Sequence, residues 1–161
     1  MKYGLKKTLI ASVAVVALTA QAFAALQFSV RVRNARLDAI ETTIGTSAHI
    51  QIWGGTKPTD CATTAVGQTK LADFALASDW ASAASAGAKS FSGTPLTTTG
   101  LAAGTASFFR LTDSTNPSTS CDEQGTVTAT GGGGDMTIDN TSIAVGQTVN
   151  ITGWTWNEPG A

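Results

Sequence analysis

Few side chains in this chain of 161 residues could carry out covalent or metal chemistry. The chain contains one histidine, two cysteines and eleven acidic residues. His49 falls on the polar face of a predicted strand, with no acid or nucleophile evident beside it. Glycoside hydrolysis needs two carboxylates on opposite sides of a cleft, and the neighbouring Asp122 and Glu123 give no sign of such a pair. The residues therefore predict a protein that is not an enzyme and has no cofactor.

Asp135 and Asp139 are weak candidates for calcium ligands. Both occupy odd positions on one predicted strand, so their carboxylates could share a face, and carboxylate oxygens are the ligands that Ca²⁺ prefers. Two carboxylates are a small ligand set, and a further donor such as Asp113 or Asp122 would be needed. We therefore favour solvated charges at a strand end and predict no metal site.

Residues 1–24 have the features of a secretory signal peptide. Lys2, Lys6 and Lys7 precede an apolar run over 9–18, and Ala22-Phe23-Ala24 supplies a cleavage site. The run is too short to span a membrane, which takes roughly 20 residues. A buried or amphipathic N-terminal helix is the alternative. The pattern predicts a bacterial protein that is secreted or held at the cell surface, with a single domain over 25–161.

Export changes the interpretation of the two cysteines and of the charge. In an oxidising compartment, Cys61 and Cys121 predict a disulfide whose loop would contribute roughly 3–4 kcal/mol to stability; free thiols or intermolecular pairing are the alternatives. Removal of the signal leaves seven basic and eleven acidic residues, a net charge of −4. Only 13% of the chain is charged, which argues against nucleic acid as a partner. No later apolar stretch is long enough to span a membrane.

The hydrophobic pattern predicts an all-β fold, an antiparallel sandwich of Ig-like or jelly-roll-like type with one short N-terminal helix. The helix is expected to begin with Asn34 as its cap, to bury Leu37, Ile40 and Ile44, and to end at Gly45. Residues 78–92 are expected to form a loop with strand character near Phe91. Strands are predicted at 26–32, 48–53, 71–76, 105–113, 125–130, 136–139 and 148–156.

The first and last predicted strands carry little charge. Leu26, Phe28, Val30 and Val32 share one face of the first, and Val149 and Ile151 share a face of the last. Exposed terminal strands without charged residues are suited to strand addition between chains. They are the predicted assembly strands, unless both pair inside the domain.

Three tryptophans are possible ligand or interface residues. Trp53 lies on the outward face of its predicted strand, and Trp154 and Trp156 share a face of the last one. Exposed tryptophans could hold a sugar ring or another protein; the favoured alternative is packing in the core or an interface. A bulge at Gly153 would turn Trp154 and Trp156 onto the face of Val149 and Ile151.

Several segments resemble a family of small, mostly unnamed proteins encoded by tailed phages and prophages. The similar segments are 25–45, Ser78-Asp-Trp80 with the Ala-Gly-Ala-Lys that follows, Phe108-Phe-Arg110 with Asp113, Gly125-Thr-Val127, 134–143 and 146–151. The resemblance implies a β-sandwich scaffold, a non-enzymatic and virion-associated role, and no catalytic residues. Members of the family begin near the equivalent of Ala25 without an export signal, which suggests a phage-type domain exported by a host.

These observations predict an exported, disulfide-bonded β domain that assembles with copies of itself into an extracellular or cell-surface filament or layer. One alternative is a phage-virion accessory protein, for decoration or in the tail. The other is a module that binds a carbohydrate or a surface glycan through Trp53, Trp154 and Trp156.

Overall fold

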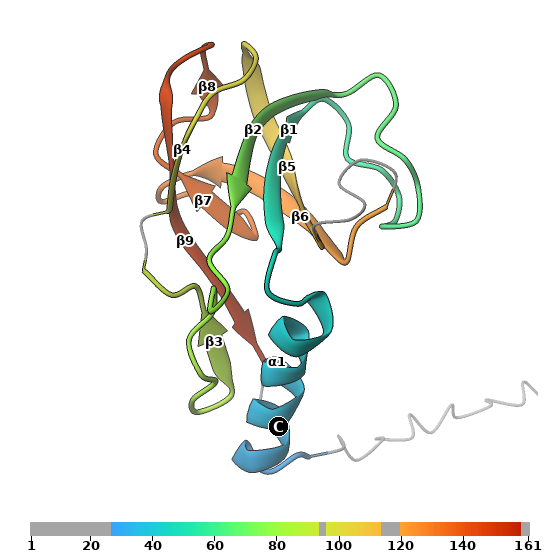
Figure 1. Ribbon diagram of the computed structural model, residues 1–161, viewed down its shortest axis with the longest axis vertical. Coiled ribbons are helices and arrows are strands. Elements are labelled where there is room, and N and C mark those ends of the chain that lie inside the picture. Colours follow the sequence, from blue (N-terminus) through green and yellow to red (C-terminus); the bar gives the residue numbers. More distant parts are fainter. Residues whose placement is uncertain (1–26, 94–95, 114–119, 159–161) are drawn as a thin grey trace, which may run out of the picture.

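The protein is built from one curled, mixed β-sheet with a helix at one end (Figure 1). The computed structural model describes residues 27–93, 96–113 and 120–158. The elements are α1 (Val30–Ile44), β1 (His49–Gly54), β2 (Thr69–Ala75), β3 (Ala88–Ser90), β4 (Leu96–Thr99), β5 (Gly104–Thr112), β6 (Glu123–Ala129), β7 (Met136–Ile138), β8 (Ser142–Ile143) and β9 (Thr148–Asn157). The predicted β-rich fold with one helix is confirmed. Among the described residues, no helix is both long and apolar enough to cross a bilayer.

The sheet curls until β2, at one end, lies beside β4. The strand order is β2-β1-β5-β6-β7-β9-β3, and β4 also pairs with β9, while β8 pairs with β5. All pairs are antiparallel except β6 with β7. Two hydrogen bonds join β4 and the loop after it to β2: Thr98 Oγ1 donates to the Asp73 carbonyl at 2.9 Å, and the Leu101 N–H donates to the Leu71 carbonyl at 2.8 Å. The curl therefore leaves β2 and β9 with neighbours on both sides.

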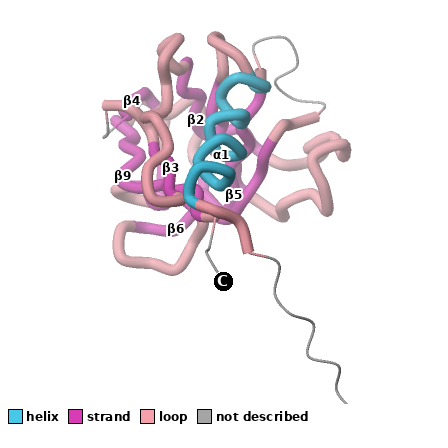
Figure 2. Tube along the Cα trace, turned by 90° about the horizontal axis from the view of Figure 1, so that it is seen from below, coloured by secondary structure: helices cyan, strands magenta, loops and turns pink. Residues whose placement is uncertain are grey.

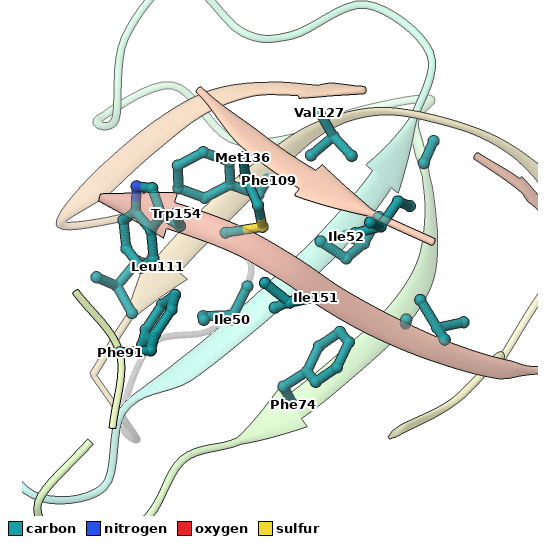
Figure 3. Close-up of a cluster of buried hydrophobic side chains, with 14 of the residues drawn as sticks. Ile50, Ile52, Phe74, Phe91, Phe109, Leu111, Val127, Met136, Ile151 and Trp154 are labelled. Carbon is teal, nitrogen blue, oxygen red and sulfur yellow. The ribbon is translucent and has the colours of Figure 1, made fainter. Parts of the chain in front are cut away.

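The core lies between β1, β2 and β5 on one side and β9 with β7 on the other (Figure 3). Its labelled members are Ile50, Ile52, Phe74, Phe91, Phe109, Leu111, Val127, Met136, Ile151 and Trp154. Each of these is at most 6% exposed. Side chains from segments far apart in the sequence therefore share one apolar interior, and their burial is the main stabilising contribution.

The outer face of β1 is also covered. Gln51 and Trp53 point away from the core, as their alternation predicts, yet they are 0% and 6% exposed. Trp53 stacks on Phe108 with a centroid separation of 6.2 Å. Beneath the segment after β1, Arg110 is fully buried and donates to the carbonyls of Cys61 and Thr63 at 2.7 and 3.0 Å. These contacts make the outer face a second small interior.

The predicted disulfide between Cys61 and Cys121 is confirmed. It joins the β1–β2 connection to the segment that leads into β6, across a sequence separation of 60. The Cys121 N–H also donates to the Cys61 carbonyl at 2.9 Å. The bond therefore fastens the covering segment over Arg110.

The helix begins earlier than expected and replaces the first predicted strand. Alternation over 26–32 predicts a strand, but Val30 and Val32 lie in the first turn of α1, and Leu26 lies outside the described residues. Ser29 is the N-cap, and its hydroxyl accepts a hydrogen bond from the Val32 N–H at 3.4 Å. Phe28 and Val30 are 40% and 46% exposed. The expected assembly strand at the N-terminus is therefore wrong.

Tertiary contacts explain why this segment is helical. Asn34, Asp38 and Glu41 fall on one side of α1, and each accepts a hydrogen bond from a backbone N–H within 81–87, at 2.9, 2.9 and 3.1 Å. Lys89 of β3, 3% exposed, donates to Asp38 and Glu41 at 3.1 and 3.0 Å. Burial lowers the pKa of Lys89, but these hydrogen bonds raise it more, so the ammonium stays charged. Asn34, Asp38 and Glu41 can face the same partners only at the spacing of a helix. Their hydrogen bonds and ion pairs therefore outweigh the preference of the valines for a strand.

The rest of α1 agrees with the sequence pattern. Leu37 and Ile44 are buried, Ile40 packs against the core, and Gly45 ends the helix with φ 91°. The Gly45 N–H donates to the Glu41 carbonyl at 2.8 Å. Figure 2, which looks at the molecule from the α1 end, shows the helix beside β3 and over the end of the sheet.

Replacing both cysteines tests how much the disulfide contributes. We expect the double variant Cys61→Ser with Cys121→Ser to lose roughly 3–4 kcal/mol of unfolding free energy, because the unfolded chain regains the freedom of the open loop. Urea unfolding followed by tryptophan fluorescence measures this loss. A reductant should shift the wild-type midpoint and leave that of the double variant unchanged. Equal midpoints for the two proteins without reductant would contradict the prediction.

Candidate functional site

A β-bulge in β9 decides where its two tryptophans point. Two consecutive residues of β7 pair with Gly153 and Ile151, which leaves Thr152 as the extra residue of the bulge. The bulge turns Trp154 and Trp156 onto the face of Ile151, so both approach the core. Trp154 is 6% exposed and Trp156 is half-buried. This is the outcome that the sequence predicts for a bulge at Gly153.

The three tryptophans do not form one exposed row. Trp53 is buried, with Phe108 as its stacking partner. Trp154 and Trp156 are neighbours, with ring centroids 3.9 Å apart, and Phe91 packs against Trp154 at 4.3 Å. Only Trp156 of this group combines core contacts with a partly open face. Of the three tryptophans considered as possible ligand or interface residues, Trp156 is therefore the one that remains a candidate for ligand contact.

A notch opens in the sheet where β7 begins. Met136, the first residue of β7, pairs with Val127 of β6 and Trp154 of β9. Before that point no described strand lies between β6 and β9. The notch holds a hollow of about 470 Å³. Its lining residues are Phe109, Glu123, Gln124, Gly134, Asp135, Trp154, Thr155, Trp156 and Asn157.

A second hollow lies between α1 and the same strands. Its volume is about 490 Å³. The lining residues are Arg36, Ala39, Ile40, Thr43, Ile44, Asp122, Glu123 and Trp156. Glu123 and Trp156 are thus shared by the two hollows and separate them. The Trp156 indole Nε1–H donates to Glu123 Oε2 at 2.7 Å, which joins the start of β6 to the end of β9.

Glu123 has the largest pKa shift toward neutrality in the described part of the chain. Burial raises the pKa of its carboxyl group to about 7, the Asp135 charge adds to the rise, and the hydrogen bond from Trp156 opposes it. A carboxyl group with this pKa exchanges its proton near neutral pH. Buried carboxyl groups of this kind concentrate at functional sites, so Glu123 and Trp156 form our candidate site.

The two calcium candidates serve separate local structures. Asp135 accepts from the Thr126 N–H and hydroxyl, both at 2.8 Å, and these bonds hold its pKa below the usual value. Asp139 accepts from the side-chain amide and backbone N–H of Asn150 at 2.6 and 3.1 Å. Within the described ranges, no group of three or more His, Cys, Asp or Glu side chains could hold a metal ion.

His49 has an acidic partner that the sequence does not reveal. Its Nδ1 lies 2.7 Å from Asp73 Oδ1, and Lys70 Nζ lies 2.8 Å from Asp73 Oδ2. Burial raises the pKa of Asp73, but the hydrogen bonds from Lys70 and His49 lower it by more than burial raises it. The pKa of Asp73 is therefore below its usual value. Asp73 lies on β2, opposite Gln51 of β1. Only strand pairing brings these residues together, and the cluster is partly exposed on the surface.

The last predicted strand exists but is not a free edge. Val149 and Ile151 are 0% exposed. Ile151 pairs with Leu96 of β4 on one side and with Ile138 of β7 on the other. These two residues are therefore part of the interior and not of an assembly surface.

Comparisons with known proteins give no further guidance on the site. No protein-family model matches the chain, and no curated protein and no solved structure shows significant similarity to it. The residues of the site and their geometry are therefore the basis for assigning a function.

The raised pKa of Glu123 predicts a specific pH dependence of stability. An unfolded glutamate loses its proton near pH 4.5, whereas folded Glu123 keeps it until about 7. In the window between these two pH values the carboxyl group of Glu123 is ionised in the unfolded chain but still protonated in the folded one. The free energy of unfolding therefore falls as pH rises, by about 3 kcal/mol in all. Glu123→Gln stays neutral and should remove this fall while retaining an acceptor for Trp156.

Urea unfolding of the two proteins from pH 4 to 8 provides the measurement. The expected result is that Glu123→Gln gains stability over the wild type as pH rises through the window. A constant difference between the two proteins would show that Glu123 titrates normally.

Proposed function

We propose that this protein is an exported, non-enzymatic structural subunit that assembles with copies of itself through its two opposite ends. The observation that carries the proposal is the contrast between those ends. One end presents exposed apolar side chains, and the other contains the apolar hollow beside α1. Because these surfaces differ, their contact would be head-to-tail, the type that extends into a filament when successive copies do not close into a ring.

The apolar end consists of the loops after β4 and β8, which lie together far from α1 (Figure 1). Two backbone hydrogen bonds hold them: the Gly100 N–H donates to the Gln147 carbonyl at 2.7 Å, and the Gly146 N–H donates to the Gly100 carbonyl at 2.9 Å. Leu101 and Val145, next to these glycines, are 54% and 70% exposed. Residues 96–109 and 140–157 contain no charged side chain. Exposed apolar surface without nearby charge favours protein contact.

The hollow beside α1 is suited to receive such side chains. Ala39, Ile40 and Ile44 of the helix and the Trp156 ring supply apolar surface, and Arg36 lies at the same hollow. Ala39 is exposed although it is flanked by residues that pack inward. Burying Leu101 or Val145 there would remove apolar area from water at both surfaces.

Other features support the proposal. The disulfide is compatible with an extracellular location, and the low charge is expected of a surface that packs against its own kind. β1, β2 and β5 face β9 across the core, an arrangement that supports the antiparallel sandwich expected from the sequence. The resemblance to phage proteins makes a virion one setting in which such an assembly could occur.

Charged substitutions at either end test the assembly. We expect Leu101→Asp with Val145→Asp, or Ala39→Arg alone, to leave the protein monomeric, because a buried unpaired charge outweighs the apolar contact. Val66→Asp makes the same chemical change at a 77% exposed valine in the β1–β2 loop and should leave assembly intact. Sedimentation velocity and negative-stain microscopy of the protein lacking residues 1–24 provide the measurements.

Two results would count against this function. A wild-type protein that stays monomeric at high concentration would exclude self-assembly, and equal disruption by Val66→Asp would exclude the proposed ends. Hydrolytic activity in a broad substrate screen would separately overturn the non-enzymatic assignment.

A further inference from the structure

We propose that the notch between β6 and β9 is a binding site for one neutral sugar ring, with Trp156 as its apolar contact and Glu123 and Asn157 as its polar contacts. This inference differs from self-assembly in the hollow and the ligand it concerns, although Glu123 and Trp156 border both hollows. Three features of the notch support the inference: its aromatic surface, the polar groups of its lining residues and the charge of those residues.

The notch supplies an aromatic surface. Trp156 is half-buried, and its ring is held from behind by Trp154 at a centroid distance of 3.9 Å and by Phe91 at 5.7 Å. The hydrogen bond to Glu123 fixes the indole at its edge. A ring held in this way loses little freedom on binding, and the C–H face of a pyranose is apolar enough to pack on it.

The notch also supplies polar groups that remain available. Glu123 Oε1 and the side-chain amide of Asn157 make no hydrogen bond to the described residues, and Thr155 is exposed next to them. By contrast, Gln124 is already engaged, since its Nε2 donates to the Pro58 carbonyl at 2.9 Å. The available set combines acceptors with an amide donor. Sugar hydroxyl groups both donate and accept, so they match such a mixed set.

Charge selects among ligands of this size. The lining contains two carboxyl groups, Glu123 and Asp135, and no basic side chain, so uronic and sialic acids would meet like charge. An organic cation is also a poor match, because the Asp135 carboxylate, although ionised, is already engaged by hydrogen bonds from Thr126 and lies within the influence of the Lys57 charge. Burial that keeps Glu123 protonated up to about pH 7 removes much of the remaining negative charge. A neutral pyranose fits both the size and the polarity of the hollow.

Titration of the protein lacking residues 1–24 with simple glycosides tests the inference. The probes are the methyl pyranosides of glucose, galactose, mannose and N-acetylglucosamine, with sodium glucuronate and tetramethylammonium chloride as charged counterparts. Saturation-transfer NMR and tryptophan fluorescence report binding. We expect at least one neutral glycoside to bind and both charged probes to fail.

Two variants locate the site. Asn157→Ala and Glu123→Gln should each weaken binding about tenfold, the effect of losing or weakening one hydrogen bond to the ligand. Asn157 is exposed and makes no side-chain hydrogen bond to the described residues, so its variant should fold normally, as circular dichroism will check. Asn140→Ala removes an exposed amide elsewhere, whose Oδ1 accepts a hydrogen bond from the Ser142 N–H at 2.9 Å, and is the control, with unchanged binding expected once circular dichroism shows that it folds.

Each other outcome overturns the inference. Failure of all the neutral glycosides to bind, or preference for tetramethylammonium or glucuronate, would exclude a neutral sugar. Binding that survives both Asn157→Ala and Glu123→Gln would place the ligand elsewhere. Repeating the titration on the Leu101→Asp, Val145→Asp variant separates this result from assembly, because that variant leaves the notch unchanged.

Discussion

The bulge in β9 decides which side chains in the second half of that strand reach the core. Thr152 is the extra residue, and its hydroxyl lies 2.7 and 3.0 Å from those of Thr130 and Thr137 on the outer face. Gly153 fits beneath Thr137, whose Oγ1 would lie 3.0 Å from an added Cβ atom. The added residue reverses the inward and outward positions for the rest of β9. Without it, both tryptophans would leave the core, and the contact between Trp156 and Glu123 could not form.

Closure of the sheet changes how self-association must be explained. A terminal strand with a free edge would offer backbone groups to another chain. Here β9 is paired on both sides at Ile151, and the segment expected to form the first strand lies partly in α1. Contact between copies would instead depend on side chains at the two ends of the molecule, where Leu101 and Val145 are exposed. A low density of charge remains consistent with both arrangements.

Most strands could be predicted from alternation, whereas the exceptions share a physical cause. β4 and β8 are short and polar, and each exists because a longer strand, β9 or β5, lies beside it. The N-terminal valines alternate as in a strand, yet the contacts of Asp38 and Glu41 with Lys89 require a helix. His49 and Asp73 are 24 residues apart and meet only through strand pairing. Local pattern cannot reveal a partner that another segment supplies.

Local periodicity was enough to predict the β-rich composition of the fold and the helical stripe of Leu37, Ile40 and Ile44, and the count of two cysteines was enough to predict the disulfide. Tertiary structure alone decided the closure of the sheet, the burial of Trp53 and the position of Glu123 beside Trp156. The raised pKa of Glu123 has the same origin, since burial depends on atoms that distant segments bring together. Pairing and burial are properties of the assembled chain, and so is the candidate site.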